Sequence, residues 1–227
     1  MKTAFNELTL SRHANDVQIA VDDTTLEGEL IIPERAPGIV IFAHGSGSSR
    51  HSPRNHFVAR TIRKSGNGTL LFDLLTREEE SEDRFTGHLR FDIPLLADRL
   101  GQTTRWLRGQ QGVDACGIGF FGSSTGGGAA LVAAAELSAN VDAVVSRGGR
   151  PDLAAEYLPK VTCPTLLLVG ELDEAVITLN EQALARMRCP KELRIIPGAT
   201  HLFEEPGALE SVANEAASWF QMYLRRK

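Results

Sequence analysis

The stretch that decides the fold is Gly119-Phe-Phe-Gly-Ser-Ser-Thr-Gly-Gly-Gly128. An apolar run, Cys116–Phe121, leads into it, and an alanine-rich helical pattern, Thr125–Leu137, follows it directly. Its centre fits G-x-S-x-G around Ser124, a pattern that is specific only when it lies between a strand and a helix. A turn this sharp forces its central residue into a strained conformation and favours glycine on both sides. The stretch therefore predicts a strand–turn–helix unit that holds the Ser124 hydroxyl above a sheet.

The same turn predicts an anion-stabilising site for a reaction intermediate. The backbone N–H of Thr125 is left free at a helix N-terminus, where the helix dipole favours an oxyanion. A second donor is expected in the loop after the first buried strand, His44-Gly-Ser-Gly47, with Ser46 as the choice and Gly47 as its competitor. His44 itself is expected to brace this loop. Two other interpretations are a glycine-rich turn without chemistry and a phosphate-binding turn, but neither nucleotide-binding glycine pattern occurs.

Around this unit, short apolar runs alternate with helical patterns. Strands are expected at Gly38–Ala43, Thr69–Leu75, Cys116–Phe121, Val141–Ser146, Thr165–Val169 and Leu193–Ile196. Helices are expected at about Pro53–Lys64, Ile93–Leu107, Thr125–Leu137, Leu179–Met187 and Ala208–Leu224. This alternation predicts an α/β fold with a largely parallel central sheet flanked by helices.

Two segments depart from the alternation. The opening third carries alternating runs at Glu7–Leu10, Val17–Val21 and Leu26–Ile32, which predict antiparallel strands at one edge of the sheet. The segment Arg77–Arg90 is polar and acidic, and it is expected to be a solvated surface loop or, alternatively, a short lid over a site. We find no linker and no internal repeat, so residues 1–227 are predicted to form a single domain.

Composition excludes several classes of protein. The 24 basic and 29 acidic residues give a net charge of −5, which argues against binding to nucleic acid or to a membrane surface. The N-terminus does not resemble a secretory signal, and there is no apolar run long enough to span a membrane, so a cytoplasmic location is expected. The 3 cysteines (Cys116, Cys163 and Cys189) are expected to be apolar filler. No metal-ligand spacing is present, and no metal or cofactor is expected.

A serine nucleophile needs a base and a group that orients the base. After an elbow of this type the chain order is Ser, then Asp or Glu, then His, and His201 is the only histidine that follows Ser124. The acid is expected to be Asp173, because it follows a glycine that closes a buried strand and so emerges at the catalytic edge of the sheet. The other carboxylates in this part of the chain remain alternatives: Asp142, which begins a strand at the opposite edge, Asp152, Glu171 and Glu174.

Together these residues resemble the α/β-hydrolase fold and, within it, the dienelactone-hydrolase-like serine hydrolases. The resemblance implies that Ser124, Asp173 and His201 are nucleophile, acid and base, and it implies a small cap or none. Dienelactone hydrolases proper use a cysteine nucleophile, so their substrate is not carried over to this chain. The resemblance runs from the strand at Gly38 to the final helix and rests on His44-Gly-Ser-Gly-Ser-Ser, Gly122-Ser-Ser-Thr-Gly, Gly170-Glu-Leu-Asp173 and Gly198-Ala-Thr-His201.

The sequence therefore predicts a monomeric or homodimeric serine hydrolase that cleaves small-molecule carboxylic esters through an acyl-enzyme. The same catalytic core would serve lactones, thioesters, amides or organophosphate esters, and these remain alternatives. A non-catalytic ligand-binding protein on this fold is an alternative of another class. Arg147 and Arg150 are candidates for binding an anionic ester, unless they pair with Asp152 or with the acidic segment.

Overall fold

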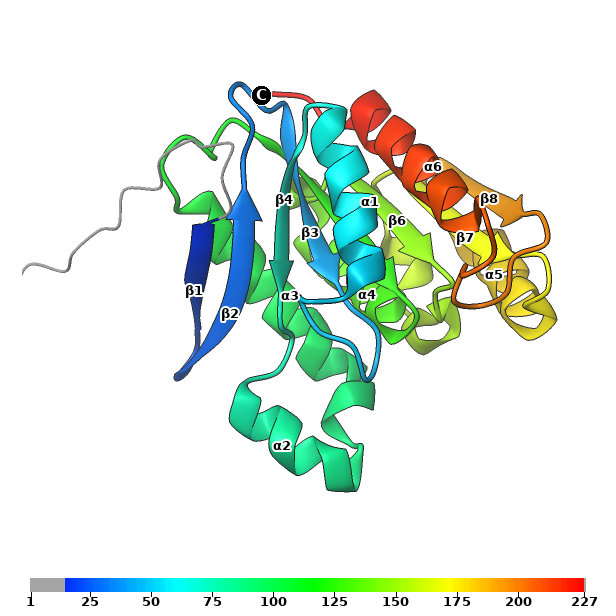
Figure 1. Cartoon of the computed structure of the whole chain (residues 1–227), viewed down its shortest axis with the longest axis horizontal. Coiled ribbons are helices and arrows are strands. Elements are labelled where there is room, and N and C mark those ends of the chain that lie inside the picture. Colours follow the sequence, from blue (N-terminus) through cyan, green and yellow to red (C-terminus); the bar gives the residue numbers. More distant parts are fainter. Residues whose placement is uncertain (1–14, 227) are drawn as a thin grey trace, which may run out of the picture.

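The computed structural model describes residues 15–226 as an eight-stranded sheet between two layers of helices (Figure 1). The strand order is β1-β2-β4-β3-β5-β6-β7-β8; β1 and β2 are antiparallel to their neighbours, and all other pairs are parallel. The α/β fold with antiparallel N-terminal strands is confirmed, while the strand expected at Glu7–Leu10 lies outside the described residues. The strands are β1(Asn15–Val21), β2(Thr24–Ile31), β3(Gly38–Ala43), β4(Gly68–Phe72), β5(Gly117–Ser123), β6(Ala143–Arg147), β7(Thr165–Gly170) and β8(Lys191–Ile196).

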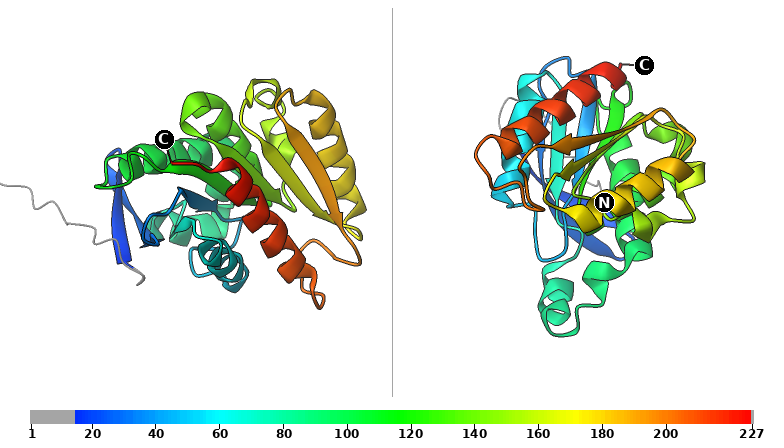
Figure 2. Two further views of the ribbon diagram at one scale, coloured as in Figure 1. Left: turned by 90° about the horizontal axis from the view of Figure 1, so that it is seen from above. Right: turned by 90° about the vertical axis from the view of Figure 1, so that its right-hand side faces the viewer.

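The helices cover both faces of this sheet. The helices α1(Pro53–Lys64) and α6(Ala208–Tyr223) lie together on one face, whereas α3(Ile93–Arg108), α4(Thr125–Leu137) and α5(Glu174–Arg186) cover the other (Figure 2). Successive strand residues alternate between the two cores: Phe120 packs toward α3 and α4, and Phe121 packs toward α1 and α6. Burial on both faces explains why the parallel strands are continuous apolar runs.

Helix α5 begins earlier than expected, at Glu174 rather than at Leu179. Its first turns carry few buried apolar residues, so the helical stripe used to predict it appears only further along the chain. This shift matters for the site, because the helix then starts directly after Asp173.

The polar segment before α3 differs from the predicted loop. Residues Arg77–Thr86 form a helix, α2, which stands apart from both helical layers beyond the ends of β3 and β4 (Figure 1). A capping box starts it: Thr76 Oγ1 accepts the Glu79 N–H at 3.2 Å, and the Glu79 carboxylate accepts the Thr76 N–H at 2.8 Å. Only Asp83 in this helix is buried, so it lacks the apolar stripe by which helices are usually predicted.

No helix within residues 15–226 has the length and apolar character needed to cross a membrane.

Candidate active site

The nucleophile elbow has the strained geometry expected of it. Ser124 lies between β5 and α4 with φ 51° and ψ −120°, a conformation that non-glycine residues rarely adopt. Its N–H donates to the carbonyl of Arg147 at 3.2 Å, and its carbonyl accepts the N–H groups of Gly127 at 2.9 Å and Arg150 at 3.1 Å. These backbone bonds hold Ser124 in its strained conformation at the carboxyl edge of the sheet.

Two glycines make this turn sterically possible. A Cβ on Gly122 would lie 2.5 Å from the carbonyl oxygen of Gly126, and a Cβ on Gly126 would lie 2.2 Å from that of Ala43. Both distances are far shorter than real contacts of a Cβ atom. The elbow is therefore held by close approach of backbone to backbone.

The structure brings the predicted acid and base together. His201 Nδ1 lies 2.6 Å from Asp173 Oδ2, and their side chains are 38% and 15% exposed. Asp173 follows β7, and His201 lies in the segment between β8 and α6, residues 197–207, which we call the base loop. A Cβ on Gly148 would lie 3.4 Å from the His201 ring, and Gly148 adjoins Arg147, whose carbonyl accepts the Ser124 N–H. Residues 147–148 thus lie next to both the His201 ring and the backbone of Ser124.

The other carboxylates considered for the acid lie elsewhere. Asp152 pairs with Arg150, and Asp142 accepts the N–H of Ile118 near the amino end of β5. Glu171 Oε2 accepts the Gly198 N–H at 2.7 Å, so Glu171 anchors the base loop. The hydrogen bond of the imidazole is made to Asp173 instead.

A second carboxylate, which sequence reasoning missed, also holds the base loop. Glu205 accepts the Thr200 N–H at 3.1 Å and the Thr200 hydroxyl at 2.6 Å, and these bonds lower the pKa of the Glu205 carboxyl. Phe203 is buried with φ 57°. The only signal in the sequence was a glutamate a few residues after the turn at Gly198. The hydrogen bonds that Glu205 makes to Thr200 depend on the tertiary fold of the loop, so they could not be predicted.

The loop after β3 packs against the elbow. The Ser46 N–H, predicted to be an oxyanion donor, donates to Thr125 Oγ1 at 2.9 Å, so both predicted donors lie side by side. His44 braces the loop as expected: its Nε2 accepts the Leu74 N–H at 3.1 Å, and its Nδ1 lies 3.0 Å from the Gly45 carbonyl. Burial lowers the pKa of His44, and an accepting Nε2 requires the neutral ring with its proton on Nδ1.

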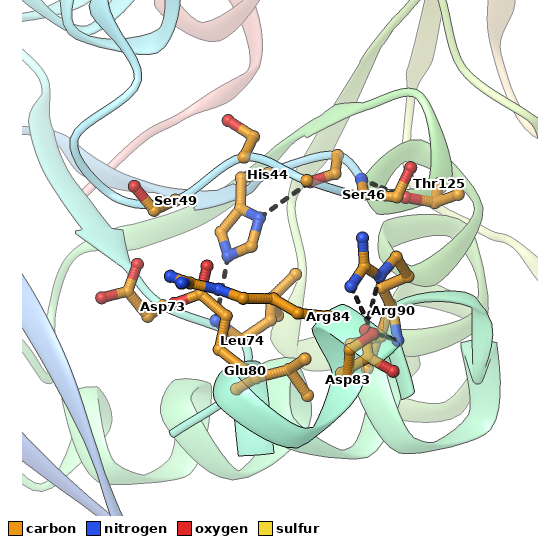
Figure 3. Close-up of a pocket in the computed structure, with 15 residues that line it drawn as sticks. His44, Ser46, Ser49, Asp73, Leu74, Glu80, Asp83, Arg84, Arg90 and Thr125 are labelled. Atoms are coloured by element: carbon orange, nitrogen blue, oxygen red, sulfur yellow. Dashed lines mark hydrogen bonds and ion pairs between the residues drawn. The ribbon is translucent and has the colours of Figure 1, made fainter. Parts of the chain in front are cut away.

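A cavity of about 300 Å³ adjoins these donors (Figure 3). Ser46 and Thr125 form part of one wall, and α2 with the following turn forms the opposite wall. There Asp83 is held by Arg90, whose Nε donates to Asp83 Oδ2 at 2.5 Å. The segment that was expected to be a loop or, alternatively, a short lid is therefore a helix that encloses space next to Ser46 and Thr125. Its lining side chains were missed because nothing local in the sequence marks them: Glu80, Asp83, Arg84 and Arg90.

The two arginines proposed for anionic esters have opposite surroundings. Arg150 Nε and Nη2 donate to the two Asp152 oxygens at 2.8 and 2.7 Å, which is the pairing considered as an alternative. Arg147 is only 8% exposed, and its Nε and Nη1 have no hydrogen-bond partner among the described residues. Burial lowers the pKa of Arg147 to about 10, which leaves it charged at neutral pH.

The cysteines are free, buried and away from the elbow, as expected for apolar filler. Cys116 precedes β5 at the end of the strand opposite Ser124. Burial raises the pKa of Cys163 to about 12, so that thiol is not a nucleophile at neutral pH. Within residues 15–226, no group of three or more His, Cys, Asp or Glu side chains could hold a metal ion.

Known proteins share this architecture. The model of the dienelactone hydrolase family matches residues 26–223. This chain belongs to the dienelactone hydrolase family. A dienelactone hydrolase from Anabaena variabilis has a crystal structure with 57% sequence identity and a TM-score of 0.92, and the match covers 94% of this chain and 99% of that one.

More distant structural resemblances concern the fold alone. Est1E from Butyrivibrio proteoclasticus is 18% identical with a TM-score of 0.76, over 91% of this chain and 97% of its own. A dienelactone hydrolase-like promiscuous phosphotriesterase from metagenomic libraries is 18% identical with a TM-score of 0.75, over 93% and 98% of the two chains.

A curated relative is longer than this chain. A Mycobacterium tuberculosis protein with the name "Putative phosphoribosyl transferase" is 53% identical over 209 residues, which are 92% of this chain and 46% of that protein. The chain thus spans about half the length of the curated relatives it matches.

Proposed function

We propose that this member of the dienelactone hydrolase family is a serine hydrolase that cleaves small carboxylic esters through an acyl-enzyme. The observation that carries the proposal is the convergence of the strained Ser124 elbow and the Asp173–His201 hydrogen bond at one edge of the sheet. Family membership supports hydrolysis as the reaction class. A serine, a base and an oriented acid are the parts that acyl transfer requires.

In the proposed reaction, His201 Nε2 takes the proton of the Ser124 hydroxyl while Oγ attacks the ester carbonyl. Asp173 keeps the other ring proton on Nδ1 and stabilises the imidazolium that forms. The tetrahedral intermediate then collapses, the alcohol leaves with the proton from His201, and a water molecule hydrolyses the acyl-enzyme by the same steps.

Two backbone donors are proposed to bind the oxyanion, the N–H groups of Ser46 and Thr125. In the resting structure the Ser46 N–H is already engaged by Thr125 Oγ1. To bind the oxyanion, the Ser46 N–H has to break its hydrogen bond to the Thr125 hydroxyl, and an oxyanion is a stronger acceptor than a neutral hydroxyl. A neutral ester carbonyl would gain less from the same change of partner. The Ser46 N–H therefore stabilises the charged intermediate more than the bound substrate, as catalysis requires.

The cavity beside these donors indicates a small substrate. At about 300 Å³ it lies at the lower end of the usual range for ligand pockets. Glu80, Arg84 and the Asp83–Arg90 pair line it, so we propose that it takes a short acyl group with polar substituents. A cytoplasmic monomer or homodimer remains our prediction for the whole protein, as do lactones, thioesters, amides and organophosphate esters as alternative substrates.

The transferase name of the longer relatives does not alter this proposal. This chain matches less than half of those proteins, so their name is not carried over to it.

A fluorophosphonate probe and a panel of p-nitrophenyl esters of increasing acyl length test the proposal. We expect stoichiometric labelling of Ser124, loss of labelling in Ser124→Ala, and highest kcat/KM for short acyl chains. Ser211→Ala is the matched control, because Ser211 is exposed on α6 and bonds only the carbonyl of Gly207. A folded protein that is neither labelled nor active on any ester would instead support the ligand-binding alternative.

A further inference from the structure

Arg147 is a buried cation that lacks a counter-charge. Its residue is 8% exposed, and Nε and Nη1 are inaccessible to solvent without a hydrogen-bond partner in the part of the chain that the structure describes. Three other arginines near the site each have a carboxylate partner: Arg90 pairs with Asp83, Arg99 with Glu79 and Arg150 with Asp152. An unpaired buried charge destabilises the folded state, so a ligand that supplied the missing anion would stabilise the protein.

The strand register shows where this side chain points. Arg147 pairs with Ser123 across β5 and β6, so the two side chains share a face of the sheet. Ser123 Oγ bonds Asn55 Oδ1 at 3.3 Å, which places that face against the first turn of α1. Arg147 is thus directed away from the cavity of Figure 3 and toward the N-terminus of a 12-residue helix.

A second guanidinium lies at this helix end. Arg54 is in the first turn of α1; its Nη1 donates to Glu204 Oε1 at 2.8 Å, whereas its Nε is buried and has no partner among residues 15–226. The guanidinium of Arg147 lies 5.8 Å from the ring centre of Phe203, the residue next to Glu204. Burial and the nearby charge of Arg54 both lower the pKa of Arg147.

The charges of this cluster leave a net positive site. Glu204, which is the carboxylate paired with Arg54, has a side chain that is 63% exposed, and it forms no ion pair with Arg147 among the described residues. The first turn of α1 contains no acidic residue; Ser52 Oγ caps it by accepting the Asn55 N–H at 3.3 Å, and Pro53 at its start has no N–H. Guanidinium groups bind oxyanions, because their N–H donors match pairs of oxygen atoms.

We propose that Arg147 and Arg54, at the N-terminus of α1, form a binding site for a small oxyanion, such as inorganic phosphate or sulfate. The bound ion would neutralise Arg147, which contacts Phe203 of the base loop and adjoins Gly148 beneath the His201 ring. Binding would thereby stabilise the base loop from the face of the sheet opposite α4. The same chemistry is presented by a free ion or by an anionic group on a substrate, and the experiment separates these sources.

The full chain is titrated with inorganic phosphate at constant ionic strength, with binding measured by calorimetry and stability by the melting temperature. For the wild type we expect one saturable site and a Tm that rises with occupancy. Arg147→Met should lose the saturable binding. In buffer without an oxyanion it should melt at the same temperature as the wild type or higher, because an unpaired buried charge has been removed. Without phosphate the Tm of Arg147→Met should therefore equal or exceed that of the wild type, and at saturating phosphate the wild type should have the higher Tm.

Arg150→Met is the matched control, since Arg150 is three positions away and already paired with Asp152; it should bind phosphate like the wild type. Arg54→Gln is a second variant and should weaken binding at least tenfold. Absence of saturable binding in the wild type, or equal binding in Arg147→Met, overturns the proposal. These binding measurements do not require turnover and can be repeated on Ser124→Ala, so their failure is distinct from failure of the proposed esterase.

Two esters identify the source of the anion. 4-Acetoxybenzoate carries a carboxylate on its leaving group, and phenyl acetate is its neutral counterpart. If phosphate competes with the charged ester alone, and Arg147→Met raises KM for that ester alone, the site takes an anionic group of the substrate. If phosphate binds and affects both esters equally, the occupant is a free ion. Both results support an oxyanion site.

Discussion

The nucleophile elbow and the base loop meet at one edge of the sheet, yet different forces hold them. At the elbow, backbone packs on backbone so closely that neither Gly122 nor Gly126 has room for a Cβ. The base loop is held by two glutamate side chains, Glu171 on the Gly198 N–H and Glu205 on Thr200. Steric contact does not depend on pH, whereas hydrogen bonds to carboxylates do.

This difference matches the different requirements of the two segments. The nucleophile must be presented in one strained geometry, and a close-packed backbone can hold a residue with φ 51° in place. The base must receive and return a proton, and its loop lies nearer to solvent, with the His201 side chain 38% exposed. We therefore expect the elbow to be sensitive to added volume and the base loop to be sensitive to lost charge.

The largest effect should come from removing the nucleophile while keeping the elbow. Ser124→Ala should lower kcat by about 10⁶-fold, because loss of a triad nucleophile leaves only oxyanion stabilisation and binding. The measurement is kcat on an activated p-nitrophenyl ester, with folding checked by circular dichroism. Retention of a tenth of the activity would mean that Ser124 is not the nucleophile.

Among the residues that hold the base, the acid that orients His201 should have the largest effect on kcat. Asp173→Asn should lower kcat by about 10³–10⁴-fold, because an amide can donate to the imidazole and so favours the wrong tautomer. Asp152→Asn and Glu171→Gln, measured on the same ester, should each cost less than about tenfold. A mild Asp173→Asn beside a severe effect at either control would show that the acid is misassigned.

The donor next to the elbow is tested by deleting an N–H group. Ser46→Pro should lower kcat by about 10²–10³-fold, since proline has no N–H to offer the oxyanion. Ser46→Ala keeps the N–H and should change kcat by less than about tenfold. Normal turnover in a folded Ser46→Pro protein would assign the donor to Gly47 or to another residue.

The close packing of the elbow is tested by adding a single methyl group. Gly126→Ala places a Cβ 2.2 Å from the Ala43 carbonyl and should destabilise the fold by about 1–3 kcal/mol, the usual cost of overpacking. Gly101→Ala in α3 is the matched control, because its Cβ would lie 3.7 Å from the nearest atom, the Arg105 guanidinium. In a denaturant titration the control should be unchanged or more stable. Equal stability of both variants would disprove steric control of the elbow.

The smallest effect should be a pH dependence confined to the base loop. The folded-state pKa of Glu205 is lowered by its bonds to Thr200, so its contribution to stability is present above the unfolded pKa of about 4.3. That contribution is lost as pH falls through the folded-state pKa. The Tm advantage of the wild type over Glu205→Gln should therefore be present at pH 7 and shrink toward pH 3. A difference that does not change with pH would assign the contribution to packing.

Much of the fold could be predicted because its signals are local. Helix Thr125–Leu137 has the predicted bounds, and the parallel strands follow the apolar runs, since burial on both faces leaves a continuous pattern. The N-terminal hairpin follows from alternation, with Val17, Ile19 and Val21 buried and the residues between them exposed. Helix α2 could not be predicted in this way, because capping and ion pairs form it without an apolar stripe.

The sequence by itself determined the position of Ser124 between strand and helix, the uniqueness of His201 after it, and the alternation that makes the sheet parallel. These depend on neighbours along the chain. Only the tertiary structure decided that Asp173 alone among the candidate carboxylates bonds the imidazole, that Thr125 engages the Ser46 N–H, and that α2 encloses the cavity. It also decided that Arg150 is paired while Arg147 is not, because the alternation of a strand directs a side chain to one face and distant segments supply its partners.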